Sequence, residues 1–177
     1  MESIHWSYYI LLVLLSIAIY TDSTKQKIYN WLTFPTLILG FAISFFNKVG
    51  IVDSLIGFIF AFMVSLIIYI TGGFKGGDVK LISAVGAWLG KSLILPALLY
   101  IFISGGILGV LYTIKNGTFI ATYHKVKSFF LGILTPGIKA HLELRESINK
   151  KMPYGIAISI GTVLALIYPN LLNSFNK

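Results

Sequence analysis

Apolar residues occur along this chain in long runs that are separated by short polar segments. The runs lie at about residues 4–21, 31–46, 51–72, 79–90, 92–114 and 153–172. An upright helix needs roughly 20 apolar residues to cross a bilayer, and local thinning accommodates shorter ones. The pattern therefore predicts an all-α integral membrane protein. It would be a six-transmembrane-helix bundle, with one membrane-embedded domain over residues 1–177.

The composition agrees with a membrane protein and removes several function classes. Of the 177 residues, 56% are apolar and 11% are charged, whereas a soluble domain carries about 25% charged residues. The absence of cysteine excludes disulfides, a thiol nucleophile and a zinc site built on cysteine. The net charge of +8 comes from basic residues scattered between hydrophobic runs, which favours a role in membrane orientation over binding of nucleic acid.

The basic residues predict how the chain is oriented. With six crossings and the N-terminus outside, the loops at 21–30, 73–80 and 115–152 share one side. That side holds eleven of the fourteen basic residues, namely Lys25, Lys27, Lys75, Lys80, Lys115, Lys125, Lys127, Lys139, Arg145, Lys150 and Lys151. Basic residues collect in cytoplasmic loops, so this side is predicted to face the cytoplasm. The long loop 115–152 mixes basic, aromatic and apolar residues and is predicted to form an amphipathic segment on the lipid surface.

Two of the six acidic residues stand at membrane borders on the predicted cytoplasmic side. Asp22 follows the first apolar run, and Asp78 precedes the fourth. Ionisable groups at bilayer depth are costly and usually mark function. The predicted topology gives the two carboxylates the same side and depth, so they could meet across a helix interface. Asp53 falls on the outer side at the start of the third run, where a solvated carboxylate near a helix N-terminus is the simpler interpretation.

A pair of aspartates that shares one proton can activate water to hydrolyse a peptide bond. Gly76 and Gly77 before Asp78 would let the backbone turn and let a substrate strand approach closely. Other interpretations stay open for each residue alone. Asp78 could cap a helix, Asp22 could pair with Lys25 at the membrane border, and Lys80 could extend to the headgroups or favour an ionised Asp78.

Three blocks of sequence resemble the type IV prepilin peptidases, membrane aspartyl proteases of the GxGD type. They are Tyr20-Thr21-Asp22-Ser23-Thr24-Lys25-Gln26-Lys27-Ile28-Tyr29-Asn30-Trp31-Leu32-Thr33, Gly76-Gly77-Asp78-Val79-Lys80-Leu81 and Met152-Pro153-Tyr154-Gly155-Ile156-Ala157-Ile158. Lys75 stands where the GxGD motif has its first glycine. The short first loop and the lack of cysteine resemble the short form of the family, which has no methyltransferase domain.

The resemblance implies a function and a site. Asp22 and Asp78 would be the catalytic pair, supported by Gly76, Gly77 and Lys80, with no cofactor and no metal. The substrates would be pilin-like or archaellin-like precursors, cut at the cytoplasmic membrane face between a short basic leader and a hydrophobic helix. No oligomeric state is implied.

A non-enzymatic membrane protein, such as a small transporter or a pilus-assembly component, is the alternative. Buried acids also carry protons in transporters. Transporters usually place such acids near the midplane at the interface of two repeats. The chain has no internal repeat, and both aspartates stand at a membrane border. Close approach of Asp22 to Asp78 would favour the protease.

Overall fold

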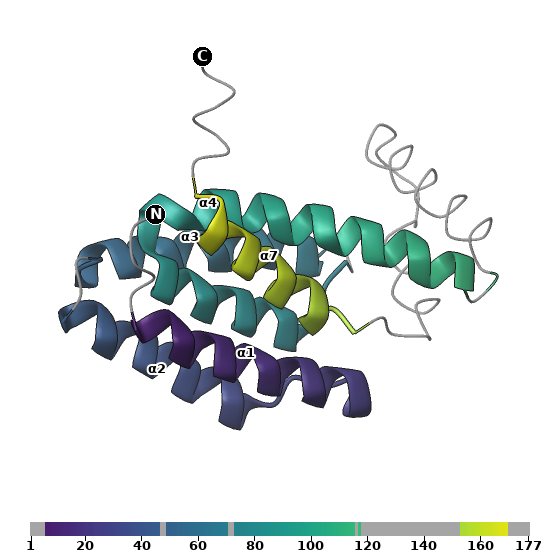
Figure 1. The fold of residues 1–177 in the computed structure, drawn as a ribbon, viewed down its shortest axis with the longest axis horizontal. Coiled ribbons are helices and arrows are strands. Elements are labelled where there is room, and N and C mark those ends of the chain that lie inside the picture. Colours follow the sequence, from purple (N-terminus) through teal and green to yellow (C-terminus); the bar gives the residue numbers. More distant parts are fainter. Residues whose placement is uncertain (1–5, 47–48, 71–72, 116, 118–152, 170–177) are drawn as a thin grey trace, which may run out of the picture.

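The fold is entirely helical in the part of the chain that the structure, a computed structural model, describes: residues 6–46, 49–70, 73–115, 117 and 153–169. The helices are α1 (Trp6–Lys25), α2 (Asn30–Phe46), α3 (Ile51–Ile70), α4 (Gly76–Lys115) and α7 (Gly155–Ile167). They form a bundle with roughly aligned axes (Figure 1). The predicted cytoplasmic loop 115–152 lies almost wholly outside the described residues, so its structure stays a prediction.

Helix α4 is bent back on itself at Gly90. The backbone there leaves the helical region, with φ 65° and ψ −175°. The ring of Phe74, just before α4, lies 6.3 Å from the ring of Phe102 in its second half. In a straight helix, 28 residues would separate these positions by about 42 Å. The halves therefore run in opposite directions (Figure 1), which matches the predicted break between the runs 79–90 and 92–114.

The first half of α4 is the centre of the bundle. Every residue from 81 to 90 is buried. Helix α3 approaches it closely, because Gly57 and Gly86 leave no room for a Cβ between the two backbones. On another side, the indole Nε1 of Trp88 donates to the carbonyl of Thr36 in α2, 2.7 Å away. Small residues and satisfied polar groups are how helices pack where water is absent, and this packing fixes the position of Asp78 at the start of α4.

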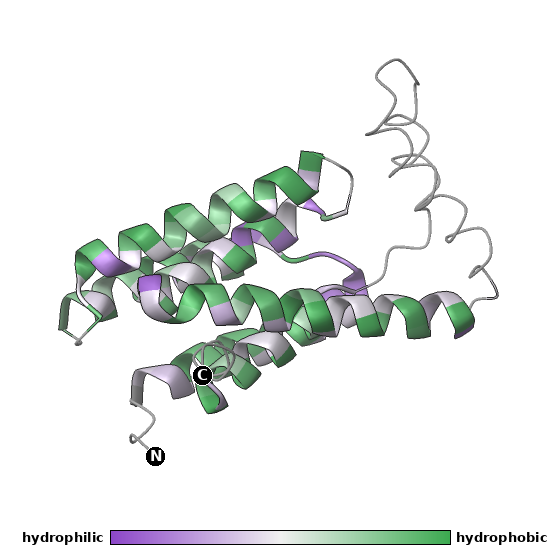
Figure 2. Cartoon of the chain, turned by 90° about the horizontal axis from the view of Figure 1, so that it is seen from above, coloured by the Kyte–Doolittle hydropathy of each residue, from purple (hydrophilic) through white to green (hydrophobic). Residues whose placement is uncertain are grey.

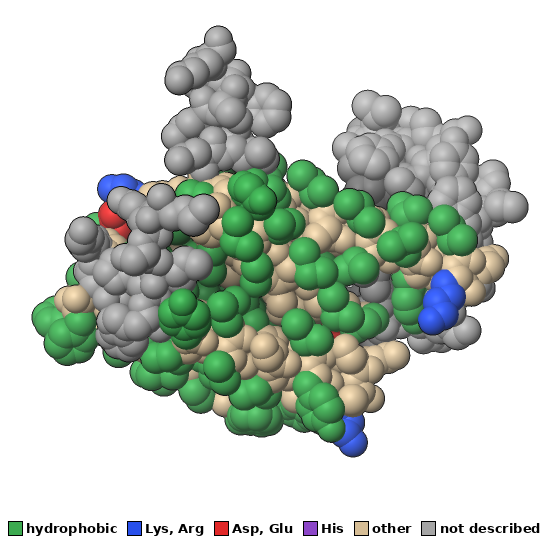
Figure 3. All heavy atoms as spheres, viewed as in Figure 1, with side chains coloured by type: hydrophobic (Ala, Val, Ile, Leu, Met, Phe, Trp, Pro, Cys, Tyr) green, Lys and Arg blue, Asp and Glu red, His purple; other side chains and the backbone are tan. Residues whose placement is uncertain are grey.

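The outer surface is largely apolar, as expected of a membrane protein. Large hydrophobic side chains are exposed along the helices, and green apolar residues dominate their outer faces (Figures 2 and 3). The charged side chains visible in Figure 3 lie towards the ends of the bundle. So large an exposed apolar surface indicates contact with lipid.

Three of the described helices are long and apolar enough to cross a bilayer: α1 from Ser7, α3 and α4. Helices α2 and α7, with 17 and 13 residues, are shorter. The all-helical fold is confirmed. The count of six crossings stays a prediction, to which the bent-back α4 would contribute two.

Candidate active site

Asp22 lies in the last turns of α1, which continues to Lys25, beyond the predicted end at residue 21. Its side chain is fully buried. The carboxylate oxygen Oδ2 accepts a hydrogen bond from the backbone N–H of Gly155, at 2.7 Å. Gly155 is the first residue of α7, so Asp22 satisfies a backbone donor that the helix itself cannot satisfy. The positive end of the α7 dipole favours a negative charge at this place.

Asp78 is the third residue of α4 and is also buried. Its Oδ2 accepts a hydrogen bond from the backbone N–H of Lys75, at 2.8 Å. An acidic side chain that reaches back to the residue before its helix is half of a capping box. The helix-capping role that the sequence left open is therefore present, but it occupies only one carboxylate oxygen.

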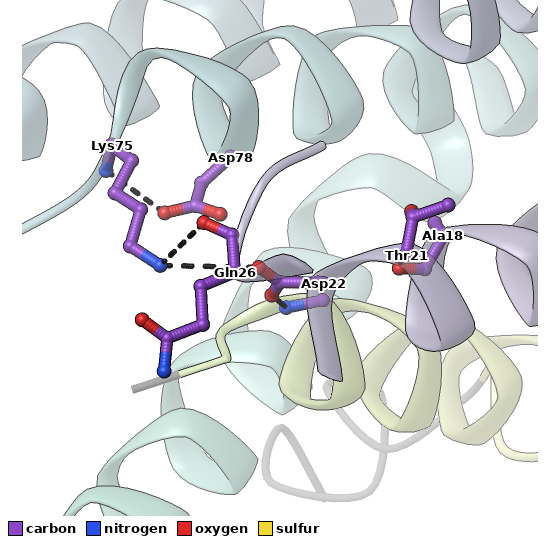
Figure 4. A network of polar contacts seen from close by, with 7 residues as sticks. Ala18, Thr21, Asp22, Gln26, Lys75 and Asp78 are labelled. Carbon is purple, nitrogen blue, oxygen red and sulfur yellow. Dashed lines mark hydrogen bonds and ion pairs between the residues drawn. The ribbon is translucent and has the colours of Figure 1, made fainter. Parts of the chain in front are cut away.

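The two aspartates have matched environments on different helices. Each is buried, each uses Oδ2 to accept one N–H from the start of a helix, and each has a buried Oδ1 with no hydrogen-bond partner among the described residues. The charges of Asp22 and Lys75 both act on Asp78, and Figure 4 shows the two carboxylates on neighbouring elements beside Lys75. A buried polar atom without a partner is costly, and such atoms are frequent where a ligand or water acts.

The cation beside this pair is Lys75, which the sequence interpretation treated as a replaced glycine and as one of the basic residues of the predicted cytoplasmic side. Its Nζ lies 3.8 Å from Asp22 Oδ1 and 3.5 Å from the carbonyl oxygen of Gln26 (Figure 4). The sequence offered one clue to this contact. Lys75 is three residues before Asp78, and residues three apart are neighbours on the same face of a helix turn. Lys25, the partner that the sequence left open for Asp22, is exposed.

The other residues singled out from the sequence have different positions. Lys80 donates to Asn30 Oδ1 at 2.8 Å and stands 5.7 Å from the ring centre of Phe34, so it links α4 to α2. Gly77 lies against the connection from α1 to α2, where an added Cβ would come within 3.0 Å of Ile28. Gly76 faces open space. Close packing against Ile28 therefore explains why residue 77 is a glycine, but it does not explain the glycine at position 76.

Gly155 is the residue of this site that the sequence reasoning missed. A Cβ there would lie 3.1 Å from both Cβ and Oδ2 of Asp22, so a glycine lets α7 approach α1 closely. Its neighbour Tyr154 packs against Phe74, with ring centres 4.7 Å apart. The clue was the Pro153-Tyr154-Gly155 block, which was noted for its resemblance alone.

Asp53 is at the other end of the bundle. It lies in the first turn of α3, and its backbone carbonyl is near Gly90, the far end of the first half of α4. Its Oδ1 forms an ion pair with Lys91 Nζ at 2.9 Å, and both side chains are partly exposed. This matches the interpretation of Asp53 as a solvated carboxylate near a helix N-terminus.

The described residues contain no group of three or more histidine, cysteine, aspartate or glutamate side chains that could hold a metal ion. Two acids of this kind can act on water without further groups: one accepts its proton while the other donates a hydrogen bond to the bond under attack. That chemistry requires carboxylate oxygens that are not already engaged in hydrogen bonds, and among the described residues neither Oδ1 atom has a hydrogen-bond partner.

Comparison with known proteins identifies the family of the chain. Neither the curated proteins nor the solved structures gave a match at the significance required. The model of one protein family, described as the type IV leader peptidase family, matches residues 9–114. This stretch is more than half of the chain and contains both buried aspartates. The chain therefore belongs to the type IV leader peptidase family.

Proposed function

We propose that this protein is an aspartic endopeptidase that removes the leader from pilin-like precursors, with Asp22 and Asp78 as its catalytic residues. The observation that carries the proposal is the matched pair of buried carboxylates. In each, one oxygen accepts a backbone N–H, and the other has no hydrogen-bond partner among the described residues. Family membership supports the peptidase class and the precursor class of substrate.

The pair would act by sharing one proton. Two carboxylates that interact in a poorly solvated site do not both ionise readily, so one remains protonated. The ionised member takes a proton from water, and the protonated member polarises the scissile carbonyl. The backbone donors at Lys75 and Gly155 would keep both carboxylates in place during the proton transfers, because hydrogen bonds from N–H to a carboxylate are strong and directional.

The cytoplasmic face is the proposed side of cleavage. Asp22 and Asp78 stand at the ends of the first and fourth runs, which the predicted topology places on the same side as most of the lysines. Basic residues collect on the cytoplasmic side of a membrane. Hydrolysis at this border would suit a precursor whose hydrophobic helix lies in the bilayer and whose leader lies in the cytoplasm.

Cleavage of a co-expressed pilin-like precursor tests the proposal. We expect Asp22→Asn and Asp78→Asn each to lower cleavage by about 10³-fold or more, because the loss of either group removes the shared proton chemistry. Asp53→Asn is the matched control, since this carboxylate is partly exposed and paired with Lys91 at the other end of the bundle. It should cleave at close to the wild-type rate.

Folding must be checked on protein extracted from the same membranes. Melting temperatures in detergent should show that the inactive variants remain folded. Processing at the wild-type rate by a folded Asp22→Asn or Asp78→Asn variant would refute the two-carboxylate mechanism. A wild-type protein that cleaves no pilin-like precursor would refute the proposed activity itself.

A further inference from the structure

The two aspartates differ in their contact with the Lys75 ammonium. Both are buried, both accept one backbone N–H, and both have an Oδ1 without a hydrogen-bond partner among the described residues. The ion pair, however, is with Asp22 Oδ1, at 3.8 Å. We propose that Lys75 decides the roles within the pair: it keeps Asp22 as the ionised member that takes the proton of water, and leaves the shared proton on Asp78. This inference rests on the proposed function.

The charges around Asp22 support this assignment. From α4 and the segment before it, Asp22 faces Lys75 and Asp78 (Figure 4). From α7 it faces only the Gly155 N–H, since α7 has no charged residue and its titratable neighbour is Tyr154. On its own helix, Lys25 is exposed. Among the described residues, Lys75 is thus the cation in contact with Asp22, and an opposite charge this close favours the ionised form of a carboxylate.

The backbone holds the ammonium at this place. Helix α1 ends at Lys25, and the next residue, Gln26, is left-handed with φ 52°. Its N–H donates to the carbonyl of Asp22, at 2.9 Å, and its own carbonyl accepts from Lys75 Nζ. The ammonium therefore lies between the end of α1, where the helix dipole favours a cation, and Asp22. The ammonium of Lys75 forms its ion pair with Asp22, and its charge also acts on Asp78. The backbone N–H of Lys75 donates to Asp78 Oδ2.

The roles give a balanced reaction. Asp22 takes a proton from water as the water oxygen bonds to the scissile carbonyl carbon, and the carbonyl oxygen takes the proton of Asp78. The C–N bond of the resulting diol then breaks. The leaving amine takes the proton from Asp22, and one diol hydroxyl returns a proton to Asp78. Both aspartates end as they began, and the peptide is hydrolysed.

Lys75→Cys allows the charge alone to be varied, because the chain has no other cysteine. The folded variant is treated with aminoethyl methanethiosulfonate, which adds an ammonium, or with propyl methanethiosulfonate, a neutral group of similar size. Both adducts retain the backbone N–H at this position. Cleavage of a detergent-solubilised pilin-like precursor is then followed across pH, together with the melting temperature of each adduct.

We expect the neutral adduct to lose activity at acidic pH. The acid limb of its pH–activity profile should move to higher pH by about one unit, because the ionised form of Asp22 loses the cation that favours it. The ammonium adduct should return the limb towards its wild-type position. A purely structural role of Lys75 would change the melting temperatures and leave the two profiles alike. Superimposable profiles for the two adducts would therefore overturn the inference.

A second pair of variants tests the inference if Lys75→Cys does not fold. Lys75→Arg keeps the charge and Lys75→Met removes it, and only Lys75→Met should move the acid limb. The same limb in both variants would also overturn the inference. These outcomes are distinct from failure of the proposed function, in which the wild type would not cleave, or folded Asp22→Asn and Asp78→Asn variants would remain active.

Discussion

The backbone N–H of Gly155 donates to Asp22 Oδ2 across 2.7 Å, although 133 positions separate the two residues in the chain. The bond joins the end of α1 to the start of α7. It orients the Asp22 carboxylate, and it gives the first N–H of α7 a partner within the bundle. The match to the family model ends at residue 114, so this bond also connects α7 to the matched part of the chain.

Gly155→Ala is predicted to impair cleavage more than folding. The new Cβ would lie 3.1 Å from Cβ and Oδ2 of Asp22, so the carboxylate has to shift by a few tenths of an ångström. Small displacements of catalytic groups are costly, and we expect cleavage to fall roughly tenfold. Gly106→Ala is the control, because a Cβ at Gly106 meets nothing within 4 Å. Precursor cleavage and melting temperature check both. Equal rates for the two variants would contradict the prediction.

Gly90→Ala is predicted to destabilise the bend in α4. Gly90 has φ 65°, and its added Cβ would lie 2.7 Å from Val49 Cγ1. The left-handed conformation alone costs a residue with a side chain about 1–2 kcal/mol. Gly50 also has a positive φ, 74°, but faces open space, so Gly50→Ala isolates the conformational cost. We expect Gly90→Ala to lower the free energy of unfolding more than Gly50→Ala, as measured by denaturant titration in detergent. A larger loss in Gly50→Ala would argue against a tightly packed bend.

Single cysteines introduced into this cysteine-free chain should report the predicted orientation. Lys27 and Lys91 are both exposed, and the charge distribution assigns them to opposite sides. We expect an impermeant maleimide to label Lys91→Cys in intact cells, and Lys27→Cys only after permeabilisation. The reverse pattern would place Asp22 and Asp78 at the outer face.

Chelation by EDTA is predicted to leave precursor cleavage unchanged. The proposed chemistry uses two carboxylates and water, and the described residues hold no cluster of three metal-binding side chains. Cleavage is measured before and after dialysis against EDTA, with a zinc protease treated in parallel as the positive control. Loss of cleavage that added zinc restores would contradict the mechanism.

The sequence alone determined most of the helical framework and both buried aspartates. Long apolar runs have few alternatives to helices in a bilayer, because every backbone polar group must be satisfied within the protein. The break at Gly90 was visible as Gly90-Lys91-Ser92 between two apolar runs. Asp22 and Asp78 stood out because acidic residues are rare in this chain and costly near a membrane.

Only the tertiary structure decided what surrounds those aspartates. Lys75 Nζ comes beside Asp22 because α1 is followed by the left-handed residue Gln26, whose carbonyl lies next to the segment before α4. The Gly155 N–H reaches Asp22 because α7 packs without a side chain at that position. Lys80, although nearer to Asp78 in sequence than Lys75, turns to Asn30 instead. Spacing along the chain fixes which residues share a helix turn, but the packing of separate helices fixes which charges meet.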